Sequence, residues 1–274
     1  MPNYNAFEGV CAEAVGCNRC FPEMGVVRAD VDIAQPRYVG PNYWASSERR
    51  LFFMINPGAG SGSSLDQTMR GEIISYRDGR LNLEELFLRQ RERFPDWGRG
   101  KFLPFVQKLG GSLDDIALLN VAWCATRGDK YPVIMLETCF AAHTLRAVRA
   151  LRPTTIIACG KSAQKFARRA GLPFVAAPHY TARFTIDFDA IRVGVVELAR
   201  TIDWTELFRA IMSTSNEARN KKGDRQPGRR FRYSEHDVIP LVRRANPKTG
   251  KSVKRYDCYR DRMTVAEYRS EVAR

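Results

Sequence analysis

Between residues 50 and 213 the chain alternates short apolar runs with longer stretches in which apolar residues recur every three or four positions. Turn residues bound each short run. Such runs are typical of strands buried on both faces of a parallel sheet. We therefore expect four strands, at residues 51–55, 115–121, 154–159 and 174–177.

The longer stretches have the spacing of amphipathic helices, as Phe102, Phe105 and Leu109 illustrate. Helices are expected at residues 81–94, 101–109, 136–151, 161–170 and 191–213. Strand and helix repeated in this order imply a parallel sheet with helices on both faces. The predicted fold class is α/β, a three-layer α/β/α sandwich around a mostly parallel four-stranded sheet.

The flanking segments have a different composition. Residues 31–49 are rich in Pro, Tyr and Ser and are expected to be irregular, and residues 220–230 form a basic linker. Residues 231–274 alternate aromatic and cationic side chains. We expect one folded domain at residues 1–213 and a small basic extension at 214–274 that nucleic acid would order.

Charge indicates the kind of partner. The chain of 274 residues has a net charge of +14, and its last 58 residues hold 17 Lys or Arg against 8 Asp or Glu. A tail this basic favours a phosphate-binding surface, so the expected partner is nucleic acid. Apolar runs fall short of the roughly 18 residues of a membrane span, and the first residues lack the pattern of a signal peptide. We expect a cytoplasmic, monomeric protein.

Candidate chemistry lies where the predicted strands end. Asn56 begins the turn Asn56-Pro57-Gly58 directly after the first strand, Asn120 ends the second strand, and His179 follows the fourth. Open α/β sheets bind ligands at the carboxyl ends of their strands. Each residue also has an ordinary interpretation, as a turn or strand-end asparagine or as a packed histidine.

Seven cysteines in a cytoplasmic chain are unlikely to form a disulfide framework. Some of them are better considered as ligands of a metal or cluster. Cys17 and Cys20 form a CxxC pair. Cys11, Cys159 and Cys258 are expected to pack as small apolar residues.

Four features occur in order: Ile55-Asn-Pro-Gly58, Leu118-Leu-Asn120, Thr154-Thr-Ile-Ile-Ala-Cys-Gly160, and Pro178-His179. Together they resemble the uracil-DNA glycosylase superfamily over residues 10–200. The cysteine pattern is similar to its iron-sulfur branch, called family four. The resemblance implies that the protein hydrolyses the N-glycosidic bond of a flipped pyrimidine and leaves an abasic site.

The resemblance also implies a 4Fe-4S cluster. In the iron-sulfur branch a CxxC near the N-terminus joins a cysteine after the second core strand and another that opens the next helix. Cys17, Cys20, Cys124 and Cys139 match these positions. A structural zinc is the alternative, although it usually takes two close CxxC pairs. Unrelated buried thiols are the third interpretation.

The resemblance assigns roles to three polar residues. Asn56 would hold the nucleophilic water, His179 would donate to the developing oxyanion on O2 of the base, and Asn120 would read the Watson–Crick edge. Two motifs depart from the family. Asn-Pro-Gly replaces the Glu-Ala-Pro-Gly usual in the iron-sulfur branch, and Pro178-His179-Tyr180-Thr181 replaces His-Pro-Ser.

Small residues follow Asn56, and their size affects which pyrimidines the site could accept. Gly58, Ala59 and residues 60–64 offer little bulk where uracil-specific members place an aromatic, and the Gly-x-Pro-Phe-Val-Gly motif is absent. The substrate could be uracil or a pyrimidine with a large C5 group, such as a glucosylated hydroxymethylcytosine of phage DNA, which would suit base-excision repair or antiviral defence. Tyr76 is the suggested stacking residue. Expected DNA contacts are Tyr180, Arg183, Lys161, Ser162, Arg229 and Arg230.

Two other functions use some of the same residues. Gly58, Gly60 and Gly62 could bind a phosphate or dinucleotide, but no Gly-Lys-Ser/Thr follows and no clear helix is expected at once after the loop. A non-catalytic, cluster-bearing DNA-binding module is the second. The joint presence of Asn56, Asn120 and His179 argues against it.

Overall fold

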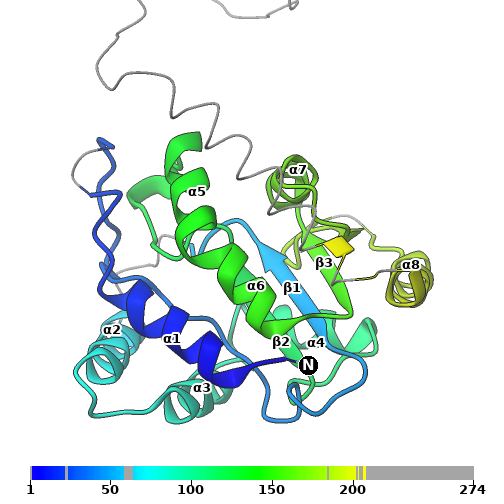
Figure 1. The fold of residues 1–274 in the computed structure, drawn as a ribbon, viewed down its shortest axis with the longest axis horizontal. Coiled ribbons are helices and arrows are strands. Elements are labelled where there is room, and N and C mark those ends of the chain that lie inside the picture. Colours follow the sequence, from blue (N-terminus) through cyan, green and yellow to red (C-terminus); the bar gives the residue numbers. More distant parts are fainter. Residues whose placement is uncertain are drawn as a thin grey trace, which may run out of the picture. The chain divides into compact units, whose positions relative to one another are not determined.

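Four parallel strands form the centre of the structure, a computed structural model, in the order β2-β1-β3-β4 (Figure 1). They are β1 (Arg50–Met54), β2 (Ile116–Asn120), β3 (Thr155–Cys159) and β4 (Val175–Ala177). Every residue of β2 and β3 is buried. Strands covered on both faces need apolar side chains throughout, which explains their unbroken apolar runs. The predicted α/β fold class is confirmed.

The structure describes residues 2–21, 24–58, 64–183, 185–201, 203 and 206–207. All of the helices and strands named here belong to one compact unit, Met1–Ser213. Ala59, Arg229, Arg230, Cys258 and the predicted basic extension at 214–274 lie outside the described residues.

One helical layer lies in front of the sheet in Figure 1. It contains a continuous helix made of α5 (Val133–Cys139), a π-helical turn (Phe140–Thr144) and α6 (Leu145–Leu151). α7 (Lys161–Arg169) packs beside it, with the rings of Phe140 and Phe166 5.0 Å apart. The predicted helix at 136–151 is confirmed and begins three residues earlier.

The opposite face is covered by α4 (Phe102–Lys108) and α8 (Phe188–Thr201). Phe52 of β1 contacts Phe102 and Phe105 at centroid distances of 6.2 Å, and the carbonyl of Val195 accepts from Thr155 Oγ1 at 3.3 Å. These contacts complete the three-layer sandwich. Among the described residues no helix is both long and apolar enough to cross a membrane.

Two helices were not predicted: α1 (Tyr4–Val15) and α2 (Ser64–Arg77). α1 has a clear start signal, because the Asn3 side chain accepts from the amide of Ala6 at 2.9 Å. α2 begins two residues after Gly62, so the expectation that no helix follows the glycine loop at once is wrong. Serine and glycine before Leu65 hid its apolar periodicity.

The dinucleotide interpretation still lacks support after this correction. Its fingerprint belongs to a compact unit of roughly 30 residues in which one helix joins two strands. Here α2, α3 (Leu83–Glu92) and α4 all lie between β1 and β2. The connection from β1 to β2 therefore differs from the single-helix crossover of a dinucleotide-binding unit.

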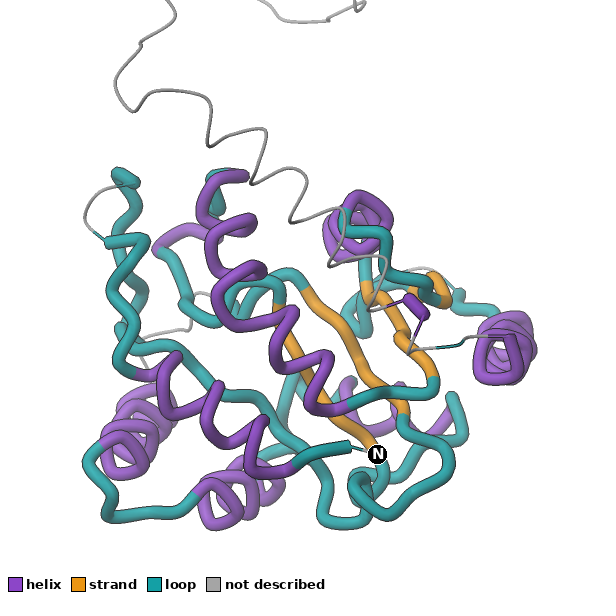
Figure 2. Tube along the Cα trace, viewed as in Figure 1, coloured by secondary structure: helices purple, strands orange, loops and turns teal. Residues whose placement is uncertain are grey.

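The irregular segment before β1 runs along the free edge of β2 (Figure 2). Leu118 N donates to the carbonyl of Tyr38 at 2.8 Å, and Gly40 N donates to the carbonyl of Ile116 at 2.8 Å. A Cβ on Gly40 would lie 2.3 Å from the carbonyl oxygens of Leu113 and Asp114, so this approach requires glycine. The pairing brings Gln35 and Arg37 toward the carboxyl end of the sheet.

Candidate functional site

Asn56, Asn120 and His179 lie at the carboxyl edge of the sheet. Met54 pairs with Asn120 in the register of β1 and β2, and the chain reaches Asn56 two residues later. His179 lies over the end of β3. A Cβ added to Gly160, the residue after β3, would stand 3.5 Å from the Cβ of His179. Parallel strands thus bring residues far apart in sequence to one edge.

Asn56 is held by the loop after β2. Its Nδ2 donates to Asp129 Oδ1 at 3.0 Å and to the hydroxyl of Tyr131. An ionised carboxylate only accepts hydrogen bonds, so the amide nitrogen, not the oxygen, must face Asp129. Oδ1 of Asn56 therefore remains an acceptor with a defined direction.

The same loop is shaped by unusual backbone angles. Asp129 has a φ of +52° and follows Gly128 at +68°. Asp tolerates this left-handed conformation better than most side chains. Tyr131 connects the loop to Asn56. Its hydroxyl accepts from the amide of Thr126 at 3.4 Å, lies 3.5 Å from Asp129 Oδ1 and accepts from Asn56 Nδ2.

His179 has a defined tautomer. The backbone N–H of Thr181 points at His179 Nδ1 from 3.4 Å, and the Thr181 hydroxyl lies 2.8 Å from the same nitrogen. A backbone N–H can only donate, so Nδ1 accepts and the proton resides on Nε2. His179 is exposed, yet desolvation by the surrounding atoms lowers its pKa below the usual value of about 6.5, which favours the neutral ring at pH 7. Its Nε2–H is thus a neutral donor.

Tyr180 connects His179 to the interior. Its ring lies 4.2 Å from that of His179, 5.3 Å from Phe102 and 6.5 Å from Trp97. A Cβ on Gly98 would stand 2.2 Å from Tyr180 Cε2. The ring is therefore wedged into the wall beside Trp97, and burial raises the pKa of its hydroxyl.

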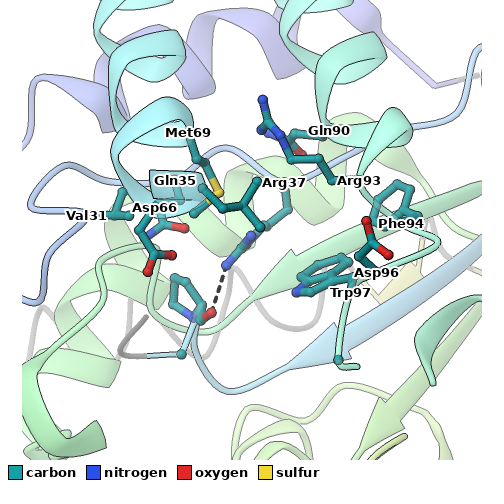
Figure 3. Close-up of a pocket in the computed structure, with 14 residues that line it drawn as sticks. Val31, Gln35, Arg37, Asp66, Met69, Gln90, Arg93, Phe94, Asp96 and Trp97 are labelled. Carbon is teal, nitrogen blue, oxygen red and sulfur yellow. Dashed lines mark hydrogen bonds between the residues drawn. The ribbon is translucent and has the colours of Figure 1, made fainter. Parts of the chain in front are cut away.

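Arg37 is a buried cation behind the Asn56 turn. Its Nη2 donates to the carbonyl of Pro57 at 3.1 Å, and its guanidinium lies 5.2 Å from the centre of the Trp97 ring (Figure 3). Burial lowers the pKa of Arg37 to about 10, opposed by the nearby hydroxyls of Tyr180 and Tyr131. Arg37 stays charged at neutral pH and stabilises the turn that carries Asn56.

Asn120 is buried, with 2% of its surface exposed. Neither Nδ2 nor Oδ1 has a hydrogen-bond partner within the part of the chain that the structure describes. Its backbone carbonyl, in contrast, accepts from Thr144 Oγ1 at 3.0 Å. An unpaired buried amide is costly and needs an explanation, such as a ligand that pairs with it.

A cavity of about 260 Å³ opens beside this edge, lined in part by Pro57, Gly58 and Trp97. Tyr76, predicted to stack on the base, does not line it. Tyr76 packs against α1, where its hydroxyl lies 3.5 Å from the carbonyl of Glu8. The structure therefore does not bring Tyr76 to this cavity.

Cys17, Cys20, Cys124 and Cys139 line one small pocket at the end of α1 and the start of the long helix. Among the described residues no group of three or more His, Cys, Asp or Glu side chains could hold a single metal ion as arranged here. Burial raises the pKa of the Cys124 thiol to about 12 and also raises the pKa of Cys20 and Cys139. Cys20, Cys124 and Cys139 are therefore held as neutral thiols, and binding a metal would have to displace their protons.

His143 lines the same pocket. It is 3% exposed, and neither ring nitrogen has a hydrogen-bond partner among the described residues. Cys139 Sγ accepts from the amide of Trp123 at 3.3 Å. Four thiols with an unpaired imidazole form a donor set that suits a sulfur-ligated cofactor. Cys11 and Cys159 lie in the apolar core instead.

The predicted DNA contacts lie in different environments. Lys161 and Ser162 are exposed at the start of α7, and Arg183 is exposed in the loop after β4. Tyr180 is half-buried and contributes to the wall described above. α7 begins at Lys161, and the N-terminus of a helix favours phosphate.

Sequence reasoning missed Arg37, Asp129 and Tyr131. Arg37 lies in a segment expected to be irregular, and an isolated arginine carries no signal of burial. Asp129 and Tyr131 lie in the loop after β2, where no local pattern indicates a contact with Asn56. Their role depends on the distance to Asn56, which is more than 70 residues away in sequence.

Comparisons with known proteins identify no family. None of the protein-family models matches this chain, and a search of curated proteins finds no match. Function must therefore be inferred from the chemistry of the site and from the motifs.

Proposed function

We propose that this chain is a DNA glycosylase, related to the uracil-DNA glycosylase superfamily, that hydrolyses the N-glycosidic bond of a flipped pyrimidine. The substrate is uracil or a C5-modified cytosine. In the reaction the bond between C1′ and N1 breaks with its electron pair on the base, water oxygen bonds to C1′, and one water proton is released.

The observation that carries the proposal is the way Asn56 is held. With Nδ2 engaged by Asp129 and Tyr131, Oδ1 is directed as an acceptor for one water. An amide is not a base, so its part is to position the water against the cationic sugar. The water loses its proton to solvent as the new bond forms.

Two further groups suit the departing base. His179, neutral with its proton on Nε2, would donate to the oxygen on which negative charge develops. Asn120 offers one donor and one acceptor to the Watson–Crick edge, and the base would satisfy both of its unpaired atoms. These contacts would offset the free energy needed to unstack and unpair the flipped base.

A 4Fe-4S cluster would occupy the cysteine pocket. Each of its irons takes one thiolate, so four thiols around one pocket suit it better than a single zinc, which needs them converged on one point. His143 would donate an N–H to a sulfur of the bound cluster. The cluster would join the end of α1 to the loop after β2, which carries Asp129.

An assay of abasic-site formation tests the proposed activity. Purified protein would be incubated with oligonucleotides carrying uracil and with DNA carrying bulky C5-modified cytosines, followed by alkali to cut abasic sites. Strand cleavage at the pyrimidine supports the proposal. If the protein binds DNA but no pyrimidine is released, the non-catalytic module is the better interpretation.

Replacing Asp129 by asparagine should lower the single-turnover excision rate by about ten- to a hundredfold, because a hydrogen bond to a charged group contributes about 1.5–3 kcal/mol. Asn tolerates the left-handed backbone, but its amide can donate as well as accept, so Asn56 would no longer be held in one orientation. Asp30→Asn, at an exposed position, serves as the control. If Asp129→Asn excises the base at the wild-type rate, Asp129 does not orient Asn56 for catalysis.

Deleting residues 217–274 should weaken DNA binding and flatten its dependence on salt, because fewer phosphate contacts release fewer counterions. Excision of short substrates at low salt should persist. Binding is measured by titration at several salt concentrations. A truncated protein whose salt slope equals that of the full chain would show that the tail does not bind DNA.

A further inference from the structure

Three side chains from different segments form a row between the two halves of the candidate site: Arg37, Trp97 and Tyr180. The guanidinium of Arg37 lies 5.2 Å from the centre of the Trp97 ring, and the centre of that ring lies 6.5 Å from the centre of the Tyr180 ring. Both distances are within the range of cation–π and aromatic contacts. One end of this connecting row lies at the turn that carries Asn56, and the other lies at His179.

The connecting row is fixed to the hydrophobic core. Trp97 stacks on Phe94 at a centroid distance of 5.0 Å. The rings of Trp97 and Tyr180 also pack on Phe102, at 4.9 and 5.3 Å, and Phe102 is fully buried. Gly98 has a φ of +63°, and a Cβ there would lie 2.2 Å from Tyr180 Cε2, so the ring needs glycine at this position. The Tyr180 ring is therefore held in one place.

Tyr180 connects His179 to that core. The side chain of His179 is exposed, and its Nδ1 bonds to Thr181 of the same loop. Hydrogen bonds within one loop do not fix a side chain relative to the sheet. The Tyr180 ring does, because it lies 4.2 Å from the imidazole at an interplanar angle of 31° and packs on Phe102 behind it. It therefore helps to set the direction in which the Nε2–H points.

Arg37 connects the Asn56 turn to the same row. Its Nη2 donates to the carbonyl of Pro57, the residue after Asn56, at 3.1 Å. Arg37 is 7% exposed and lies against Trp97 (Figure 3). A hydrogen bond from a charged guanidinium is stronger than one between neutral groups, so it restrains the turn. Trp97 is thus linked, through one neighbour on each side, to both residues assigned to the reaction.

The proposed reaction needs those two residues at a fixed separation. The water held by Asn56 attacks C1′, whereas the Nε2–H of His179 meets the oxygen of the departing base. The two groups act on the two fragments that separate as the glycosidic bond breaks, so an error in their spacing weakens both effects at once. A misplacement of about 1 Å can cost about a hundredfold in rate.

We propose that Arg37, Trp97 and Tyr180 are positioning residues that fix the spacing between Asn56 and His179. The inference rests on the proposed glycosylase function and adds residues that act through others rather than on the base. It also gives Tyr180 a role other than the DNA contact expected from the sequence. The ring of Tyr180 is required for this role, whereas its hydroxyl is not.

Substitutions at the two ends of the row test the assignment on the pyrimidine that the wild type excises. Tyr180→Leu removes the ring, and Arg37→Met removes the guanidinium but keeps an unbranched side chain. Each should lower the single-turnover rate by about ten- to a hundredfold and leave the dissociation constant for DNA nearly unchanged. Because both act through Trp97, the double variant should lose less than the product of the single losses. Tyr180→Phe should retain the wild-type rate, and Arg89→Met, at an exposed position, is the matched control for Arg37→Met.

A second measurement requires no substrate. The chain has three histidines, so ¹⁵N labelling of histidine gives an NMR spectrum in which His179 is assigned by comparison with His179→Ala. Wild-type His179 should show the tautomer with its proton on Nε2. Tyr180→Leu and Arg37→Met should shift these signals toward the average of the two tautomers, because a mobile ring loses its bond to Thr181. Tyr180→Phe and Arg89→Met should leave them in place.

The outcomes separate this inference from the proposed function. If the wild type excises no pyrimidine, the glycosylase function fails, and the histidine signals decide whether the row positions His179. Signals and rates that stay unchanged in Tyr180→Leu and Arg37→Met would overturn the inference. It is also overturned if the losses multiply in the double variant. If Tyr180→Phe weakens DNA binding as much as Tyr180→Leu does, Tyr180 is a DNA contact and not a positioning residue.

Discussion

Replacing His179 by alanine should lower the single-turnover rate of base excision by about 10²–10³-fold, equivalent to about 2.7–4 kcal/mol. In the proposed mechanism the neutral Nε2–H meets charge that develops only as the glycosidic bond breaks, so the loss should appear in the rate rather than in binding. Asn56→Ala should cause a loss of similar size, because the directed Oδ1 that holds the water is removed. Rapid-quench measurement with enzyme in excess gives these rates.

Binding to intact DNA separates catalysis from folding for these two variants. Neither side chain is needed to hold the duplex, so the dissociation constants should change much less than the rates. Asn42→Ala, at an exposed position, is the matched control. Undiminished cleavage by His179→Ala would overturn the mechanism.

Anaerobically purified protein should be brown and contain about four irons per chain. Replacing Cys124 or Cys139 by alanine should abolish the visible absorption and most of the bound iron, because each of the four thiolates would hold one iron of the cluster. Iron analysis and absorption spectroscopy measure both effects.

Cys11→Ala is the matched control for the cofactor prediction. Cys11 is also fully buried, but it lies in the apolar core and not in the pocket of the four cysteines. Its replacement should leave the iron content unchanged. A colourless wild-type protein that holds one zinc would refute the cluster and favour the structural zinc site.

Local pattern was sufficient for most of the fold. A strand buried on both faces is apolar along most of its length, and this pattern is visible in the runs that became β1, β2 and β3, where polar residues occur only at the strand ends. The same pattern placed Asn56 and Asn120 at strand ends, and parallel pairing made their proximity predictable. The sequence did not predict α2, because the serine- and glycine-rich residues before Leu65 obscure the apolar spacing of its first turn.

The environment of each site residue was decided only by tertiary structure. Nothing near Asn56 in sequence indicates that Asp129 and Tyr131 orient its amide, since that contact depends on how the loop after β2 folds over the end of β1. Likewise, Arg37 becomes a buried cation because its segment pairs with the edge of β2. Residue type and strand position follow from the sequence alone, whereas hydrogen-bond partners and cavities arise from contacts between distant segments that local periodicity does not encode.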